Sequence, residues 1–252
     1  EWGCTTAVAP APGERSNRML RVLDWPMHGL GRHVVVARER TKMGPFYNVT
    51  WPGAVGVLTA MAPGRFAAAI NQAPMRRHRL TLAGDWAKNR IDVWRTRALP
   101  PAHLLRLVFE TAPDFATARE LLTHTPLALP CLFARSGIGP HEGVVIERLE
   151  TRAVVHEAQA GRTHLACAPL ACANDWLSPG LGGRPRGHDN ARRRAALSGL
   201  ADQPLQGFGW LRPPVLNPRT RLAVVADAGL GRLAVLGFER HGPATQEFQW
   251  VH

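Results

Sequence analysis

The pattern of apolar and polar positions divides the chain into strand-like and helix-like stretches. In the first seventy residues, short runs rich in valine, threonine, alanine and aromatic residues alternate with glycine- and proline-rich breaks. Such punctuated runs are typical of β-strands joined by turns. They predict strands at residues 5–9, 19–23, 33–37, 46–51, 55–59 and 65–70.

The spacing of apolar residues changes in the middle of the chain. After a Pro-Pro pair, apolar residues recur every three or four positions, which predicts a helix over 101–111. Asp114 is placed to cap a second helix over 115–125. Further on, we expect strands at 129–135, 143–148, 153–157 and 163–168, a helix from 189 to 201, and a closing hairpin of 221–226 with 232–238.

The order of these elements predicts the fold class. Many strands, a helical middle, many strands and a further helix suit an α+β fold with two antiparallel sheets stacked face to face and helices outside, a four-layer αββα sandwich. The 252 residues show no internal repeat and no long linker. We therefore expect one domain over residues 1–252.

Composition and charge exclude several classes of function. Apolar residues make up 45% and charged residues 20%, a globular balance, and no apolar run reaches the length of a membrane-spanning helix. The 31 basic and 19 acidic residues give a formal net charge of +12. The basic residues are mostly scattered arginines, so we expect a solvated surface (residues 76–79 above all) and no nucleic-acid partner. Stable membrane insertion is not expected either.

The four cysteines are too few for a disulfide scaffold. The spacing between Cys167 and Cys172 lacks the second ligand pair of a zinc site, although the two could pair across a turn. We expect Cys131, Cys167 and Cys172 to be buried free thiols. The sequence contains no phosphate-binding or dinucleotide-binding loop, and neither a metal nor an organic cofactor is expected.

Cys4 stands apart because of its surroundings. It opens a strand of small residues, and the next predicted strand carries Arg21 and Asp24. A cysteine at a newly made N-terminus can attack amide bonds, since its own α-amine can take the thiol proton. Taken singly, these residues are more often a buried thiol and a structural ion pair. A cysteine–histidine pair with His28, His33 or His164 is a further possibility.

Six segments in order carry a resemblance to a known family: residues 4–9, 20–26, 53–59 with 63–66, 140–148, 173–174 and 192–197. The chain resembles the cysteine N-terminal nucleophile (Ntn) hydrolases, in the branch of acid ceramidase and N-acylethanolamine acid amidase. Penicillin V acylase and bile salt hydrolase are more distant relatives. The resemblance implies the αββα fold and an enzyme that hydrolyses linear amides.

The resemblance also implies roles for particular residues. Cys4 would be the nucleophile, freed by cleavage of the Gly3–Cys4 bond. Arg21 would favour the thiolate, and Asp24 would orient the α-ammonium group. Asn174 would donate to the oxyanion of the tetrahedral intermediate. Arg192 would match the first of two arginines that organise the site.

The implied substrate is a small N-acyl amide with an apolar acyl group. Asn71, Gln72, Trp25 and Met61 are the expected substrate-binding residues, with Trp51 and Trp86 as further candidates for the pocket. Gln72 stands where the lysosomal relatives have a glutamate, so their acid pH dependence is not expected here. Asp175 likewise replaces the tyrosine that usually follows the asparagine.

The prediction is therefore an autoprocessing cysteine amidase that acts through a thioester. An acyltransferase using the same thioester and a non-catalytic binding protein on this fold remain alternatives. The chain begins with Glu1 rather than methionine, as a removed export signal, a cleaved propeptide or a trimmed chain would leave it. We interpret residues 1–3 as residual propeptide or linker, and expect an exported, periplasmic or secreted, protein in preference to a cytoplasmic one. The sequence leaves homo-oligomer formation open.

Overall fold

The computed structural model describes residues 2–11, 16–157, 169–201, 203–205, 207–240 and 242–251. Two sheets face each other. The first has the order β10-β1-β2-β11-β12-β13, with β14 also paired to β12. Its strands are β1 Gly3–Pro10, β2 Asn17–Asp24, β10 Leu170–Cys172, β11 Thr220–Asp227, β12 Arg232–Glu239, β13 Gly242–Pro243 and β14 Phe248–Val251.

The second sheet follows chain order from β3 to β9. Its strands are β3 Val35–Thr41, β4 Gly44–Thr50, β5 Thr59–Ala62, β6 Phe66–Gln72, β7 Cys131–Gly137, β8 Gly143–Arg148 and β9 Ala153–Glu157. The strand pairs of both sheets are antiparallel. The helices are η1 Leu30–His33, α1 Leu82–Arg95, α2 Pro101–Thr111, α3 Phe115–His124 and α4 Asn190–Ala201.

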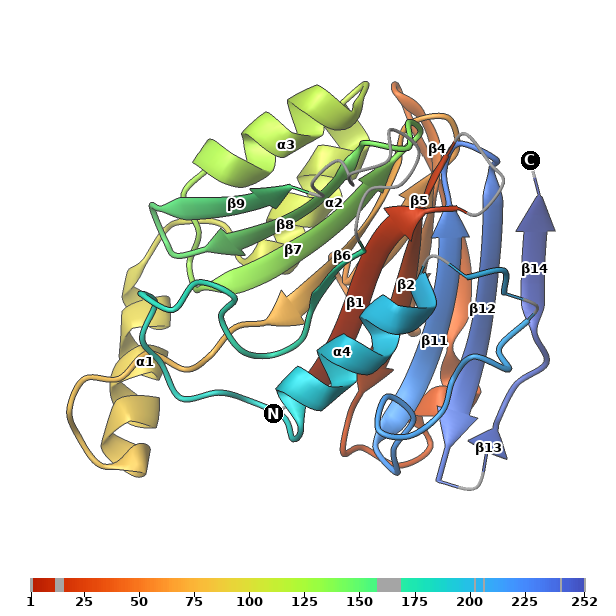
Figure 1. Ribbon diagram of the computed structural model, residues 1–252. Coiled ribbons are helices and arrows are strands. Elements are labelled where there is room, and N and C mark those ends of the chain that lie inside the picture. The colour runs from red at the N-terminus through yellow and green to blue at the C-terminus, as the bar shows by residue number, and fades with distance from the viewer. Residues whose placement is uncertain are drawn as a thin grey trace.

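Three apolar clusters show why the layers stack. One lies between the sheets and contains residues such as Val8, Val49 and Leu132. A second joins the outer face of the second sheet to α2 and α3, and a third joins the outer face of the first sheet to α4. Figure 1 shows α4 over one sheet and α2 and α3 over the other. The predicted four-layer αββα sandwich is confirmed.

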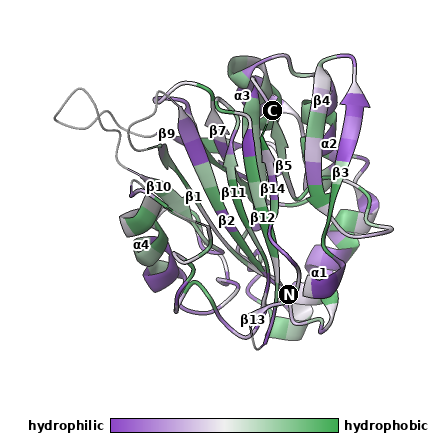
Figure 2. Cartoon of the chain, turned by 90° about the vertical axis from the view of Figure 1, so that its right-hand side faces the viewer, coloured by the Kyte–Doolittle hydropathy of each residue, from purple (hydrophilic) through white to green (hydrophobic). Residues whose placement is uncertain are grey.

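Hydropathy follows this layering. Both faces of the central strands are covered, so β2 is buried along its whole length. In Figure 2 the strands of the first sheet are mostly pale to green, whereas much of the edge strand β3 is purple. Charged side chains on an edge strand discourage pairing with other chains. No helix among the described residues is long and apolar enough to cross a membrane.

Most predicted elements are present, and two differences have physical causes. The strand expected at 55–59 is wrong: Gly53 and Gly56 adopt positive φ angles of 80° and 94°, which turn the backbone, and β5 begins at Thr59. The helix α1 was not predicted, because Asp85 is its one buried residue and no apolar stripe marks it. The strand expected at 163–168, with His164 and Cys167, lies outside the described residues.

Candidate active site

Cys4 lies on β1 with its side chain between the two sheets, where it is fully buried. The neighbouring strand β2 brings Arg21 to it: Nη2 of Arg21 donates to Sγ of Cys4 at 3.0 Å and to the carbonyl oxygen of Ile70 at 2.8 Å. The antiparallel register places Thr6 opposite Arg21, so the guanidinium reaches diagonally to the sulfur. The predicted meeting of Cys4 and Arg21 is present in the structure.

The Arg21 guanidinium is fully buried and its partners are neutral. Its Nη1 donates to Oγ1 of Thr6 at 3.0 Å and to Oδ1 of Asn71. No ion pair among the described residues involves Arg21. A buried cation without a carboxylate favours any anion that can form beside it, and the sulfur of Cys4 is the group in that position.

Burial raises the pKa of the Cys4 thiol above its ordinary value. The charge and hydrogen bond of Arg21 oppose this effect, while Asp24 adds to it. Burial therefore favours the neutral thiol while Gly3 is still attached. If water reached the sulfur, the desolvation that raises the thiol pKa would be smaller, and the attraction of Arg21, which lowers this pKa, would remain.

Asp24 ends β2 directly opposite Gly3. Its Oδ1 accepts a hydrogen bond from Oγ1 of Thr220 at 2.8 Å. A Cβ atom added to Gly3 would lie 3.3 Å from both Cβ and Oδ2 of Asp24. The carboxylate is therefore beside the Gly3–Cys4 peptide bond, and the glycine leaves room for it.

Asn174 lies two residues after the end of β10 and is fully buried. Its Oδ1 accepts a hydrogen bond of 2.7 Å from the backbone nitrogen of Cys4, and its Nδ2 donates to the carbonyl oxygen of Gln72 at 2.9 Å. The amide oxygen of Asn174, rather than its nitrogen, therefore faces the group that would become the α-amine. In this uncleaved chain Asn174 positions the Cys4 nitrogen, and its role as oxyanion donor stays a prediction.

Arg193, not Arg192, is the helix α4 arginine that reaches this site. Arg193 is 3% exposed, whereas Arg192 lies on the solvent side of the helix. Nη1 of Arg193 donates to the carbonyl oxygen of Cys4 at 3.0 Å and to Oδ2 of Asp24 at 3.2 Å. Its Nη2 donates to Oδ1 of Asn174 at 3.2 Å. The placement expected for Arg192 is corrected accordingly.

The helical period explains the correction. Leu197 is the other buried side chain of α4 among the described residues, and it packs on the first sheet. The position four residues earlier lies on the same face of the helix, and that position is Arg193. Once the structure shows that Leu197 faces the sheet, the helical spacing places Arg193 on the same face.

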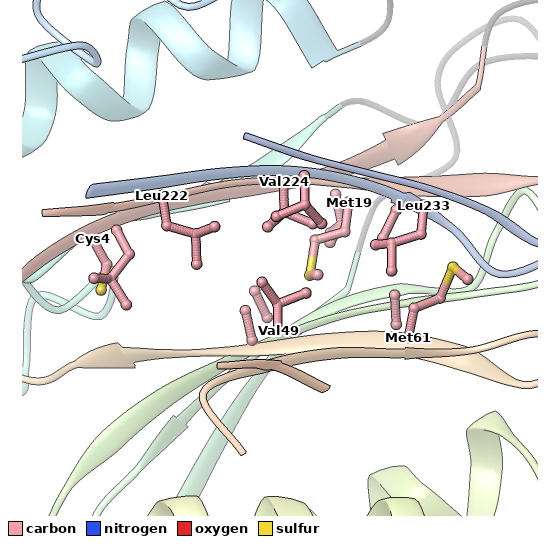
Figure 3. Close-up of a cluster of buried hydrophobic side chains, with 14 of the residues drawn as sticks. Cys4, Met19, Val49, Met61, Leu222, Val224 and Leu233 are labelled. Atoms are coloured by element: carbon pink, nitrogen blue, oxygen red, sulfur yellow. The ribbon is translucent and has the colours of Figure 1, made fainter. Parts of the chain in front are cut away.

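The expected substrate-binding residues fall into different places. Asn71 is fully buried, and its Nδ2 donates to the carbonyl oxygens of Cys172 and Ala173 at 3.1 and 3.0 Å, so it supports the site from inside. Trp25 follows β2 at the same end of the sheets as Asp24. Met61 does not belong to the site: it is fully buried in the core, and Figure 3 shows it at the opposite end of the cluster from Cys4.

Gln72 lies beside the backbone that precedes Cys4. Its amide is best assigned with the nitrogen donating to the carbonyl oxygen of Trp2 at 2.9 Å and the oxygen accepting from Nη1 of Arg186 at 2.7 Å. Gln72 therefore holds the acyl side of the Gly3–Cys4 bond.

Sequence reasoning missed Glu147, which supports the site from the second sheet. This β8 residue is fully buried, and its carboxylate accepts hydrogen bonds from the backbone nitrogens of Leu177 and Ser178 at 2.5 and 3.2 Å and contacts Nε2 of His156 at 2.8 Å. These bonds fix the turn that follows Asn174. An acidic residue within a strand of apolar residues was the signal in the sequence.

The histidine alternative finds no geometric support in the described residues. His28 and His33 are exposed, and the contacts of the Cys4 sulfur are with Arg21 and Ile70. Cys131 and Cys172 are buried free thiols, as predicted. Burial raises the pKa of Cys172 to about 12, so Cys172 is not a second thiolate at neutral pH.

Comparison with known proteins gives structural neighbours. No protein-family model and no curated protein matches the chain. The N-acylethanolamine-hydrolyzing acid amidase ortholog of Caenorhabditis elegans superposes with a TM-score of 0.68 at 18% identity, over 99% of this chain and 100% of that one. The chain has the Ntn-hydrolase fold.

Two variants of the conjugated bile acid hydrolase of Clostridium perfringens superpose with TM-scores of 0.58 and 0.56 at 10% identity, over 98% of this chain and 92% of each of theirs. The likeness therefore extends over the whole Ntn-hydrolase fold. At these identities the neighbours establish the fold, and the chemistry has to be argued from the residues of this chain.

Proposed function

We propose that this chain is a self-cleaving cysteine amidase that hydrolyses the linear amide bond of an N-acyl substrate through a thioester on Cys4. One observation carries the proposal. A buried thiol lies 3.0 Å from an arginine that has no carboxylate partner among the described residues, and the backbone nitrogen of the same cysteine donates to Asn174 at 2.7 Å. The nucleophile and its future base are thus held together.

In self-cleavage, the Cys4 sulfur attacks the carbonyl carbon of Gly3. The carbon–nitrogen bond breaks, the proton lost by the thiol passes to the Cys4 nitrogen, which leaves as a free amine, and Gly3 is joined to the sulfur as a thioester. Water then hydrolyses the thioester, which gives a carboxylate on Gly3 and restores the thiol. Asp24, beside Gly3, and Arg193, on the Cys4 carbonyl, hold this peptide in place.

In hydrolysis of a substrate, the new α-amine takes the thiol proton while the sulfur attacks the acyl carbonyl carbon. The substrate nitrogen leaves with a proton from the α-ammonium group, and water cleaves the thioester. Asn174 accepts a hydrogen bond from the α-amine, and the charge of Arg21 stabilises the thiolate. Neither step requires a histidine.

The structural neighbours support the same reaction class. One of them is an amidase that hydrolyses N-acylethanolamines and the other hydrolyses conjugated bile acids, and both have the fold described above. This chain places a cysteine, two arginines, an aspartate and an asparagine at one end of that fold (Cys4, Arg21, Arg193, Asp24 and Asn174).

The test combines mass spectrometry with an activity assay. The purified protein is incubated, its intact mass and first residue are measured over time, and hydrolysis of fluorogenic N-acyl amides is followed. We expect loss of the residues ahead of Cys4 and the appearance of amidase activity with the same time course. Cys4→Ala should abolish both, while Cys131→Ala serves as the matched control.

The outcomes separate the alternatives. A Cys4→Ala protein that still hydrolyses the amides would refute the assignment of the nucleophile. A wild-type chain that keeps its leader and shows no activity would favour a binding protein. Transfer of the acyl group to an added amine, in place of its release as the acid, would identify an acyltransferase.

A further inference from the structure

Trp2, two residues ahead of Cys4, occupies an aromatic site at the end of the inter-sheet core. Its indole stacks on Trp25 with a centroid distance of 5.8 Å and an interplanar angle of 10°. Trp25 in turn contacts Trp51 edge-on at 6.1 Å and 69°. Trp2 also packs against both the cluster between the sheets and the cluster under α2 and α3. The indole is thus held by flat and apolar surfaces.

Two cavities flank this indole. A cavity of about 440 Å³ extends from Trp2 and Gly3 to Asp24 and Arg193. A second cavity of about 520 Å³ extends from Trp2 to Gln72 and helix α1. Trp2 lines both cavities. Removal of the residues ahead of Cys4 would open the aromatic site toward both cavities.

The position of Trp2 is informative because self-cleavage and substrate hydrolysis share one nucleophile. In self-cleavage the Gly3 carbonyl is the acyl carbonyl, so Trp2 and Gly3 form the acyl half of the first amide that Cys4 attacks. A substrate attacked by the same sulfur presents its acyl half to the same surfaces. Trp2 therefore shows which side chain these surfaces accept.

We infer that the acyl group of the substrate carries a flat ring system that takes the place of the Trp2 indole on Trp25, in preference to an unbranched alkyl chain. This inference rests on the proposed function. A parallel ring on an indole gains stacking beyond the area it buries, whereas a flexible chain loses rotational freedom there. We expect a preference on the order of tenfold in kcat/KM, the size that such stacking gives.

The experiment uses the self-cleaved protein and two amides of 7-amino-4-methylcoumarin, with 4-(indol-3-yl)butanoyl and dodecanoyl as acyl groups of equal carbon number. The indole substrate should be preferred on the order of tenfold. Trp25→Leu should remove this preference, and Trp25→Phe, which keeps a flat ring, should retain most of it. Equal rates in the wild-type protein, or a preference for dodecanoyl, would overturn the inference.

A second measurement does not depend on the folding of a variant. Peptides ending in Trp-Gly and in Leu-Gly are compared as competitive inhibitors of the wild-type self-cleaved protein. The tryptophan peptide should bind on the order of tenfold more tightly, and equal inhibition would contradict the inference. If hydrolysis occurs without either preference, only this inference fails. If neither self-cleavage nor hydrolysis occurs, the proposed function fails and takes the inference with it.

Discussion

Arg193 offers the sharpest test of the site, because its neighbour Arg192 is a natural control. The change Arg193→Ala removes a guanidinium that is 3% exposed and binds Asp24, Asn174 and the backbone of Cys4. The Asp24 carboxylate, 5% exposed, would keep its hydrogen bond from Thr220 and lose its cation. Breaking a buried ion pair by removal of one partner costs ~3–5 kcal/mol.

We therefore expect Arg193→Ala to lower the free energy of unfolding by about 3 kcal/mol. Arg192→Ala, on the exposed face of α4, should change it by less than about 0.5 kcal/mol. Urea denaturation measures both, in a Cys4→Ala background that keeps every sample uncleaved. With Cys4 present, intact-mass time courses should show slow or absent self-cleavage for Arg193→Ala and normal cleavage for Arg192→Ala. Equal effects of the two changes, on stability or on cleavage, would refute this reasoning.

Three further changes test other parts of the site. Arg21→Met should slow self-cleavage at pH 7, and part of the rate should return as the pH rises, because loss of the cation raises the pKa of the Cys4 thiol further. Arg21→Lys, which keeps the charge, is the control. A loss of rate that does not depend on pH in the mass assay would contradict the electrostatic role. Gly3→Val should slow self-cleavage on the order of tenfold, because the added Cβ would lie 3.3 Å from Asp24. An unchanged time course of self-cleavage would argue against that crowding. Glu147→Ala should lower the free energy of unfolding by ~2 kcal/mol through its buried hydrogen bonds. Glu150→Ala, at a partly exposed surface ion pair, is the control in the same urea titration.

The architecture was accessible from the chain because local signals agree with it. Strand-like runs interrupted by glycine and proline, and a helical period in the middle, are properties of neighbouring residues, and they predicted most strands together with α2, α3 and α4. The helix α1 escaped because its stability depends on contacts outside its own sequence. Asp85, its buried residue, accepts hydrogen bonds from the backbone of His78 and from Arg184, and Arg184 is 99 positions away.

The candidate site also has a part that the sequence predicts and a part that depends on the tertiary structure. The order of Cys4, Arg21 and Asp24 on two consecutive strands is local, because an antiparallel hairpin brings such positions together. The arrival of Asn174 and Arg193 is not local, since the pairing of β10 with β1 and the phase of α4 on the outer face decide which side chains reach the cysteine. A sequence names the residues able to do chemistry, and packing decides which of them meet, because burial and distance depend on segments far apart in the chain.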